Sequence, residues 1–133
     1  MSGIQTQKLT VVKVGGAILE DAESLSGFLD RFVALPGLKI LVHGGGRAAT
    51  RMAAKLGIES KMVEGRRITD AETLEIVTMV YGGLVNKNTV AALQARDCNA
   101  AGFTGADLNL VKASKRPVAD IDYGFVGDIT AVQ

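Results

Sequence analysis

The spacing of apolar residues changes twice along the first part of the chain. Residues 9–14 (LTVVKV) are rich in β-branched side chains and are followed by two glycines, a pattern typical of a short buried strand. Apolar residues at helical spacing occupy 25–32, and residues 35–38 (LPGL) end that helix before a second apolar segment, 39–43 (KILVH). Strand, helix and strand in this order predict a right-handed βαβ unit with a parallel sheet.

The middle of the chain carries the signals of a second helix, a hairpin and the start of a third helix. Residues 47–56 place small and apolar side chains on one helical stripe that ends at Gly57, a residue type that favours the position just after a helix. Glu64 and Gly65 lie between two short extended runs and predict a hairpin turn. The sequence TDAE that begins at Thr69 matches a capping box, so Thr69 is expected to begin the next helix.

The longest helical pattern covers residues 70–95. Its apolar face consists of Leu74, Val77, Tyr81, Leu84 and Val85. A glycine pair, Gly82 and Gly83, weakens the middle by about 1 kcal/mol per glycine relative to alanine and marks a kink or close packing. Beyond this helix, residues 98–103 (CNAAGF) are strand-like, and residues 110–133 predict a further strand and a hairpin.

The composition is that of an ordinary globular domain. The chain has 133 residues, of which 47% are apolar and 22% charged, so residues 1–133 can bury a core as a single α/β domain. A net charge of +1 gives no electrostatic reason to expect a nucleic-acid or membrane partner. The sequence has neither a membrane-spanning apolar run nor the order of a signal peptide. The single cysteine, Cys98, can form no internal disulfide, which fits a reducing cytoplasm.

Three consecutive glycines follow the second predicted strand, in the sequence KILVHGGGRAAT (39–50). A strand that ends in glycines before a helix presents backbone N–H groups at the positive end of the helix dipole, where carboxylates and phosphates bind. The alternative is a tight turn that binds nothing. The second glycine pair, Gly15 and Gly16, follows the first strand and favours anion binding over that alternative.

This loop lacks one nucleotide-binding motif and matches another. The Walker pattern of glycine, four residues and Gly-Lys-Ser/Thr does not occur in the sequence. Gly44 to Ala49 satisfy the dinucleotide fingerprint, and Glu64 follows at about the 20-residue distance at which such sites place the acid that binds ribose. A dinucleotide-binding module is therefore one alternative, although it leaves the KVGG sequence at 13–16 and the arginine pair at 66–67 unexplained.

Lys13 interrupts the first apolar strand close to its carboxyl end, where open parallel sheets bind their ligands. One interpretation is a lysine that extends its ammonium group to water at the end of the strand. The other is a fixed positive charge that faces the same crevice as the glycine loop, where it would stabilise the negative charge of a transferring phosphoryl group. The residues alone leave both interpretations open.

Four motifs occur together in the order and spacing of one known family. They are KVGG at 13–16, VHGGG at 42–46, EGRRIT at 64–69 and VNK at 85–87. With these motifs the sequence resembles the amino-acid kinase superfamily, and within it the N-acetylglutamate kinases, over essentially the whole chain. The resemblance implies an α/β fold with an open, mostly parallel sheet sandwiched by helices, with the hairpin as a lid. It also implies a homodimer joined through the long helix.

The activity that the resemblance implies is phosphorylation of the side-chain carboxylate of N-acetyl-L-glutamate in arginine biosynthesis, with ATP and Mg²⁺. Lys13 matches the lysine that stabilises the transferring phosphoryl group, and Gly15 and Gly16 match the loop that approaches this group. No metal-ligand set is expected in this chain. We interpret Asn86 and Lys87 of the VNK motif as helix-face residues near the site and not as a catalytic pair.

The same resemblance assigns the substrate contacts. Gly45 and Gly46 match the glycines whose backbone contacts the acylglutamate, and Arg67 matches the arginine that holds its α-carboxylate, a group suited to the forked donors of arginine. Arg66 is adjacent on an extended strand and is expected to face the opposite way, towards solvent. His43 is the only histidine of the sequence, and we expect it to orient the glycine loop.

Two departures from the family pattern leave alternatives open. The sequence GFTGADLN at 102–109 lacks the lysine and the final glycine of the corresponding family loop, so N-succinylglutamate is an alternative substrate. The ATP-binding C-terminal half of the family is also absent from this sequence. Residues 1–133 are therefore expected to be the acylglutamate-binding half, inactive alone, and a non-catalytic binding domain of the same fold is a third possibility.

Overall fold

The computed structural model describes residues 8–133 and begins with a parallel pair of strands joined by two helices. The strands are β1 (Leu9–Val14) and β2 (Leu38–His43), and the helices between them are α1 (Gly16–Glu20) and α2 (Ala22–Ala34). The pairing runs in register from Leu9 opposite Leu38 to Val14 opposite His43. The predicted parallel strand–helix–strand unit is confirmed, with α1 as a short extra helix directly after the first glycine pair.

Only one face of this two-stranded sheet is covered within the described residues. Val12 and Leu41 pack against a core cluster formed by helices on that face. On the other face Leu9 is 50% exposed and Val11 is 59% exposed. The expectation that residues 9–14 form a buried strand is therefore right for one face and wrong for the other, because no element among residues 8–133 covers the second face.

Helix α3 (Gly46–Lys55) and a small hairpin follow as predicted. Gly57 lies just beyond the helix with a φ of 74°, the left-handed conformation that glycine adopts at helix ends. The hairpin consists of β3 (Met62–Val63) and β4 (Arg66–Arg67). Its two turn residues, Glu64 and Gly65, have φ values of 50° and 75°, which are typical of the two-residue turns that match the strand twist.

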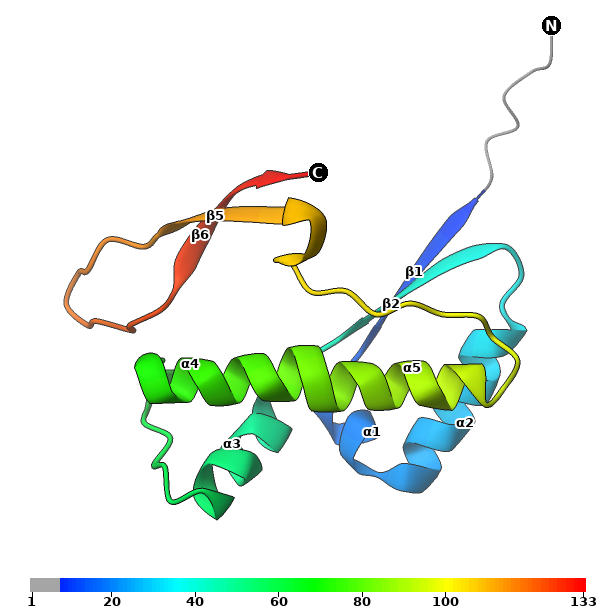
Figure 1. Ribbon diagram of the computed structural model, residues 1–133, viewed down its shortest axis with the longest axis horizontal. Helices are drawn as coiled ribbons and strands as arrows, with labels where there is room; N and C mark the ends of the chain where they lie inside the picture. Colours follow the sequence, from blue (N-terminus) through cyan, green and yellow to red (C-terminus); the bar gives the residue numbers. More distant parts are fainter. Residues whose placement is uncertain (1–7) are drawn as a thin grey trace, which may run out of the picture.

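The predicted long helix forms, but its middle is not α-helical. It consists of α4 (Ala71–Thr78), a π-helical segment η1 (Met79–Val85) and α5 (Asn86–Gln94). Figure 1 shows α3 under the first half of this helix and α1 and α2 under the second half. The glycine pair at 82–83 lies in η1, and a Cβ on Gly82 would lie 3.1 Å from Thr104 Cγ2, so the prediction of close packing is confirmed for Gly82. Among residues 8–133, no helix has the length and apolar character needed to cross a membrane.

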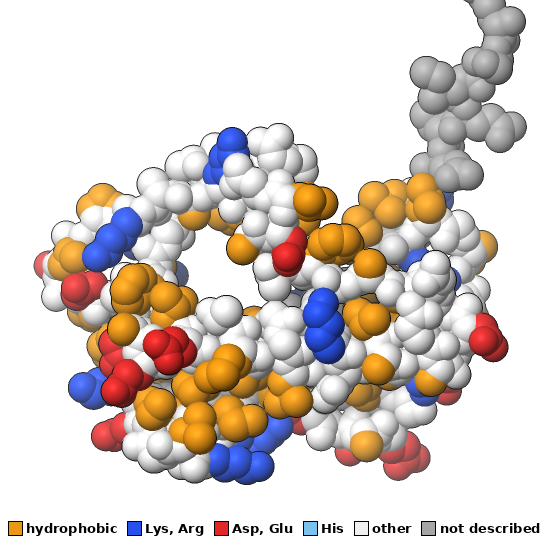
Figure 2. Space-filling view, in the orientation of Figure 1, with side chains coloured by type: hydrophobic (Ala, Val, Ile, Leu, Met, Phe, Trp, Pro, Cys, Tyr) orange, Lys and Arg blue, Asp and Glu red, His pale blue; other side chains and the backbone are white. Residues whose placement is uncertain are grey.

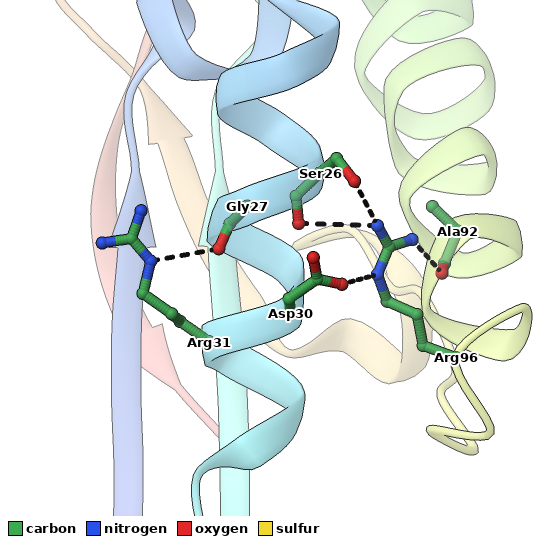
Figure 3. Close-up of polar contacts among 6 residues, drawn as sticks. All are labelled: Ser26, Gly27, Asp30, Arg31, Ala92 and Arg96. Carbon is green, nitrogen blue, oxygen red and sulfur yellow. Dashed lines mark hydrogen bonds and ion pairs between the residues drawn. The ribbon is translucent and has the colours of Figure 1, made fainter.

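The two halves of the long helix bury different cores. Residues of α4 and η1 pack on α3 in a cluster of Ala49, Ala53, Ile76 and Val80. Residues of α5 pack on α2 in a cluster of Leu29, Phe32 and Leu93. The end of α5 is also tied to α2 by Arg96, whose guanidinium donates to Asp30 Oδ1 at 2.7 Å and to Ser26 Oγ at 2.7 Å (Figure 3). These contacts hold the helical layer together beneath the sheet.

Asp70, and not Thr69, caps the N-terminus of α4. Its Oδ1 accepts from the backbone N–H of Thr73 at 2.9 Å, and the hydrogen bond with Thr73 lowers the pKa of Asp70. The backbone N–H of Thr69 donates to Tyr123 O at 2.9 Å, and its carbonyl accepts from Phe125 N at 2.7 Å. The predicted capping box is therefore wrong by one residue, since the C-terminal part of the chain takes up the backbone groups of Thr69.

The strand expected at residues 98–103 does not form. Three of its carbonyl groups accept hydrogen bonds from side chains of α5 instead of from a neighbouring strand. Gln94 Nε2 donates to Ala100 O at 3.0 Å. Lys87 Nζ donates to Gly102 O at 3.0 Å, and Asn86 Nδ2 donates to Phe103 O at 3.4 Å. The prediction was wrong because the segment packs along the helix and has no strand partner among the described residues.

The chain ends in an antiparallel pair of exposed strands, which we call the C-terminal arm (residues 110–133). A short 3₁₀ turn, η2 (Asp107–Asn109), precedes β5 (Val111–Lys115), which pairs with β6 (Gly127–Val132). The predicted strand and separate hairpin are thus a single strand pair. Figure 2 shows an opening between this arm and the helices, and a bridge between Thr69 and Gly124 joins the two parts.

Gly124 is where we expect a single added methyl group to disrupt the attachment of the arm. It has a φ of 76°, and a Cβ at this position would clash with the carbonyl of Thr69. Gly57 offers a matched control, because it has a φ of 74° with no neighbouring atom within 4 Å of such a Cβ. We expect Gly57→Ala to lower the free energy of unfolding by about 1–2 kcal/mol, the strain of a left-handed alanine. Gly124→Ala should lower it clearly more, because of the added clash. Urea unfolding measures both, and equal losses would contradict a tight bridge.

Candidate functional site

The two glycine segments leave the sheet side by side. Val14 is opposite His43 in the register, so Gly15 and Gly44 follow at the same edge. Helix α1 then begins at Gly16 and α3 at Gly46, which brings the positive ends of two helices to the carboxyl ends of two parallel strands. Figure 1 shows β2 reaching the middle of the long helix at this point. The edge of the sheet therefore presents backbone donors to an anion.

Part of the reason for the glycines lies inside the molecule. A Cβ on Gly45 would lie 3.2 Å from the ring of Tyr81, and a Cβ on Gly46 would lie 3.3 Å from its hydroxyl oxygen. Gly15 and Gly44 have no neighbouring atom within 4 Å of such a Cβ among the described residues. Close packing by Tyr81 therefore accounts for two of the missing side chains, while the space beside Gly15 and Gly44 stays open.

Arg67 reaches from the hairpin to the start of α3. Its Nη2 donates to Gly46 O at 2.8 Å and to Thr50 Oγ1 at 2.7 Å. Its Nε is buried and has no acceptor among residues 8–133, a condition that costs about 1–3 kcal/mol for a buried donor. Arg66 is exposed, as expected for neighbouring residues on an extended strand. Arg67 of the hairpin is thus in direct contact with Gly46, the first residue of α3.

His43 contacts the glycine loop directly. Its Nδ1 lies 2.9 Å from Gly44 O, and its Nε2 lies 3.1 Å from Asn86 Nδ2. Asn86 is 6% exposed and is the first residue of α5. The expectation that His43 orients the loop agrees with these contacts.

Lys13 lies on the open face of the sheet. It is exposed, pairs in register with Val42 and forms no ion pair among the described residues. A cavity of about 200 Å³ beneath the glycine segments is lined by Gly16 and Gly45 from the two loops, but neither Lys13 nor Arg67 lines it. The predicted site residues therefore surround one edge of the sheet without sharing a single enclosed cavity in this part of the chain.

A short loop on the way to the C-terminal arm is held by one carboxylate. Asp107 Oδ2 accepts from the backbone N–H of Thr104 at 2.6 Å and from its hydroxyl at 2.7 Å. The hydrogen bond from the Thr104 side chain lowers the pKa of Asp107. Residues 8–133 contain no group of three or more His, Cys, Asp or Glu side chains placed to hold a metal ion. The carboxylate of Asp107 therefore stabilises the loop between Thr104 and Asp107.

Sequence reasoning missed three residues that shape the glycine loop. Thr50 follows Gly46 by one helical turn, so its place beside the Arg67 contact was available from helical spacing. Tyr81 was expected only as one member of an apolar stripe, although its ring covers the loop. Asn86 was expected on a helix face but is buried, and no local pattern separates these two cases.

Comparison with known proteins places the chain in a family. The model of the amino acid kinase family matches residues 8–133, which is nearly all of the chain. The chain belongs to the amino acid kinase family. It is 66% identical over 126 residues to the acetylglutamate kinase of Phocaeicola vulgatus, covering 95% of this chain and 49% of that protein. It is 41% identical over 128 residues to the acetylglutamate kinase of Methanopyrus kandleri, covering 93% of the chain and 49% of that protein. This family member thus spans about half the length of the curated relatives it matches.

Solved structures agree on the fold. The crystal structure of smu.665 from Streptococcus mutans superposes with a TM-score of 0.66 at 23% identity, covering 94% of this chain and 51% of that one. The N-acetylglutamate synthase of Neisseria gonorrhoeae, solved with coenzyme A and L-arginine, superposes with a TM-score of 0.64 at 23% identity, covering 93% of this chain and 30% of that one. At this identity the superpositions support the amino acid kinase fold alone.

The position of Arg67 yields a test of the paired arginines. We expect Arg67→Lys in the full-length protein to weaken binding of a carboxylate ligand, with N-acetyl-L-glutamate as the probe, at least about tenfold, or about 1.4 kcal/mol, because a lysine lacks the forked donors that reach two groups at once. Arg66→Lys is the matched control on the exposed side of the same strand and should change the affinity less than about twofold. Calorimetric titration measures both, and equal effects at the two positions would contradict the site.

Proposed function

We propose that the protein carrying this chain phosphorylates the side-chain carboxylate of N-acetyl-L-glutamate with ATP, as a step of arginine biosynthesis, and that residues 8–133 form its acylglutamate-binding half. The observation that carries the proposal is the meeting of two glycine segments and Arg67 at the carboxyl edge of one parallel strand pair. Identity of 61–66% to proteins named acetylglutamate kinase supports the choice of substrate.

The substrate roles follow from the donors at this edge. We assign the backbone N–H groups of Gly45 and Gly46 and the guanidinium of Arg67 to the α-carboxylate and acyl part of the substrate. A carboxylate that approached Arg67 would supply an acceptor for the Nε that is buried without one, after a small movement of the guanidinium. The nucleophile is the ionised side-chain carboxylate, which needs no general base, and this fits a histidine that is engaged by Gly44 and Asn86.

The phosphoryl roles fall to the first strand. We assign Lys13 to the negative charge that develops on the transferring phosphoryl group, and Gly15 and Gly16 to its close approach, since both glycines follow β1 at the same edge as the substrate loop. ATP supplies the phosphoryl group, and Mg²⁺ would neutralise part of its charge. Because residues 8–133 lack a metal-ligand cluster, we place the Mg²⁺ and adenine contacts in the half of the relatives that this chain does not span. A soluble cytoplasmic enzyme without a nucleic-acid partner fits the balanced charge.

The dinucleotide alternative loses support from the position of Glu64. In that alternative the acid follows a parallel strand and binds a ribose. Here Glu64 is a turn residue of the hairpin between β3 and β4, with a φ of 50°. The fingerprint at Gly44 to Ala49 therefore has no acid in the place that the dinucleotide site needs.

A homodimer through the long helix is a further part of the proposal, with a revised contact. Val77 and Tyr81 of the predicted stripe pack against α3 and the glycine loop within the chain. Met79 is 53% exposed and Leu84 is 45% exposed, so these two side chains of η1 are the apolar surface that remains for a second copy, and Leu84 also lines the cavity beside Gly16 and Gly45. In a two-fold contact the same patch supplies both sides.

Replacement of Lys13 tests the catalytic assignment. We expect Lys13→Ala in the full-length protein to lower kcat at least about 100-fold, because the charge acts on the transition state, while acetylglutamate affinity changes only a few-fold. Lys112→Ala, on the exposed strand β5, is the control and should leave kcat unchanged. Steady-state kinetics that show a raised KM with unchanged kcat for Lys13→Ala would refute the assignment.

Sedimentation equilibrium tests the dimer. We expect Leu84→Asp to convert a dimer into a monomer at micromolar concentration, because it places a charge in the middle of the shared patch. Leu108 is 80% exposed in the loop before the C-terminal arm, so Leu108→Asp is the matched control and should leave the dimer intact. If the unsubstituted protein sediments as a folded monomer, the dimer is wrong.

A further inference from the structure

A chain of three hydrogen bonds connects α5 to the glycine loop. Lys87 Nζ donates to Asn86 Oδ1 at 3.1 Å, Asn86 Nδ2 lies 3.1 Å from His43 Nε2, and His43 Nδ1 lies 2.9 Å from Gly44 O. Lys87 and Asn86 also donate to the backbone carbonyls of the segment that follows α5. These hydrogen bonds therefore connect the loop at the end of β2 with a segment that lies more than fifty residues later in the sequence.

The donors and acceptors of these three hydrogen bonds fix where each proton lies. An ammonium group only donates, so the atom of Asn86 that faces Lys87 is its carbonyl oxygen, and its NH₂ group faces His43. The NH₂ group only donates, so Nε2 of His43 carries a lone pair. The carbonyl of Gly44 only accepts, so Nδ1 carries the proton. These contacts fit one neutral tautomer of His43. The other tautomer would place two donors face to face at Nε2 and two acceptors face to face at Nδ1, and an imidazolium would place two donors face to face at Nε2.

The last hydrogen bond sets the direction of a donor that the site uses. The peptide unit between Gly44 and Gly45 is planar and trans, so its N–H points opposite to its carbonyl. When His43 holds the carbonyl of Gly44, the N–H of Gly45 is turned the other way. Without that bond, a glycine-rich segment is free to rotate its peptide units, because glycine has few steric limits on φ and ψ.

The neighbouring backbone is shaped to leave room for the Asn86 amide. A Cβ on Gly102 would clash with Asn86 Oδ1 and would lie 2.9 Å from a methyl carbon of Val90. The amide is buried at 6% exposure, so it has no water-filled space into which it can turn. Gly102 is thus the position at which one methyl group would displace Asn86 without removing any polar group of the chain.

We propose that Asn86 is a positioning residue that fixes the tautomer of His43 and, through it, the direction of the Gly45 N–H for binding the anionic substrate. The inference rests on the proposed function for the identity of that substrate, N-acetyl-L-glutamate. Asn86 itself touches no substrate in this account. It acts through two atoms of His43 and one carbonyl of the loop.

The tautomer of His43 is the first test, and it does not depend on any ligand. Nitrogen NMR of the full-length protein labelled with ¹⁵N-histidine distinguishes a protonated Nδ1 from a protonated Nε2, and a His43→Gln variant assigns the signal. We expect a neutral ring with the proton on Nδ1. A ring protonated on Nε2, or an exchanging mixture of tautomers, would overturn the proposal.

Two variants then test the positioning. Asn86→Leu removes the donor with similar volume, and Gly102→Ala displaces the amide while keeping it. We expect both to abolish the single tautomer, to shift the amide signal of Gly45 and to weaken N-acetyl-L-glutamate binding at least about tenfold by calorimetry. Asn99→Leu is the control, since Asn99 is exposed and its side chain bonds, among residues 8–133, only Gln94 at the end of α5. Affinity within twofold of the unsubstituted protein in a folded Gly102→Ala or Asn86→Leu variant would refute the positioning role.

Failure of the proposed function gives a different result. If the unsubstituted protein binds no N-acetyl-L-glutamate, the substrate is wrong. In that case the tautomer of His43 and the amide signal of Gly45 still test the positioning role, because both are measured without ligand. A variant that loses the tautomer but leaves the Gly45 signal unchanged would overturn the role, and loss of both together would support it.

Discussion

The parallel pairing of β1 with β2 is the constraint on which the rest of the arrangement depends. Because Val14 lies opposite His43, the glycine segments follow the two strands at the same edge, and a helix starts two residues after β1 and three residues after β2. The first backbone N–H groups of two helices then lie at one edge of the sheet, an arrangement at which backbone donors bind anions. A shift of the register by two residues would separate the two segments by about 7 Å and disperse the donors.

The glycine loop is held by contacts on its protein side. The ring of Tyr81 packs against Gly45 and Gly46, Arg67 grips the first carbonyl of α3, and His43 holds the carbonyl of Gly44. These contacts come from three separate elements, namely the π-helical segment, the hairpin and β2. The loop is therefore preorganised, which reduces the conformational entropy that an anionic ligand would have to overcome on binding. The absence of side chains serves both the internal packing and the access of a ligand.

The sequence predicted the elements that depend on local chemistry. Glycines with positive φ at positions 57 and 65 ended a helix and formed a hairpin turn where the pattern placed them, and Gly82 packs closely in the middle of the long helix, as its glycine pair predicted. The alternation of neighbours on an extended strand separated Arg67 from Arg66. The motifs at the ends of the two strands also placed the glycine segments of the candidate site before any contact was known.

Features that depend on distant parts of the chain were not predictable in the same way. Asp70 caps the helix in place of Thr69, whose backbone groups bond to residues 123–125. Residues 98–103 do not form a strand, because side chains of α5 supply their hydrogen bonds. The exposed face of β1 reflects the lack of a covering element among the described residues, which no local pattern records. Tyr81 and Asn86 lie where they do because the long helix passes the end of β2, a tertiary relation that helical spacing alone cannot show.

An NMR titration of the full-length protein with N-acetyl-L-glutamate tests most directly whether this edge of the sheet binds the substrate. We expect the amide signals of Gly45 and Gly46 and the guanidinium signal of Arg67 to shift together and saturate at one affinity, while the signal of Arg66 stays in place. Saturable binding that shifts signals elsewhere and leaves these three unchanged would contradict the account, and so would the absence of any binding.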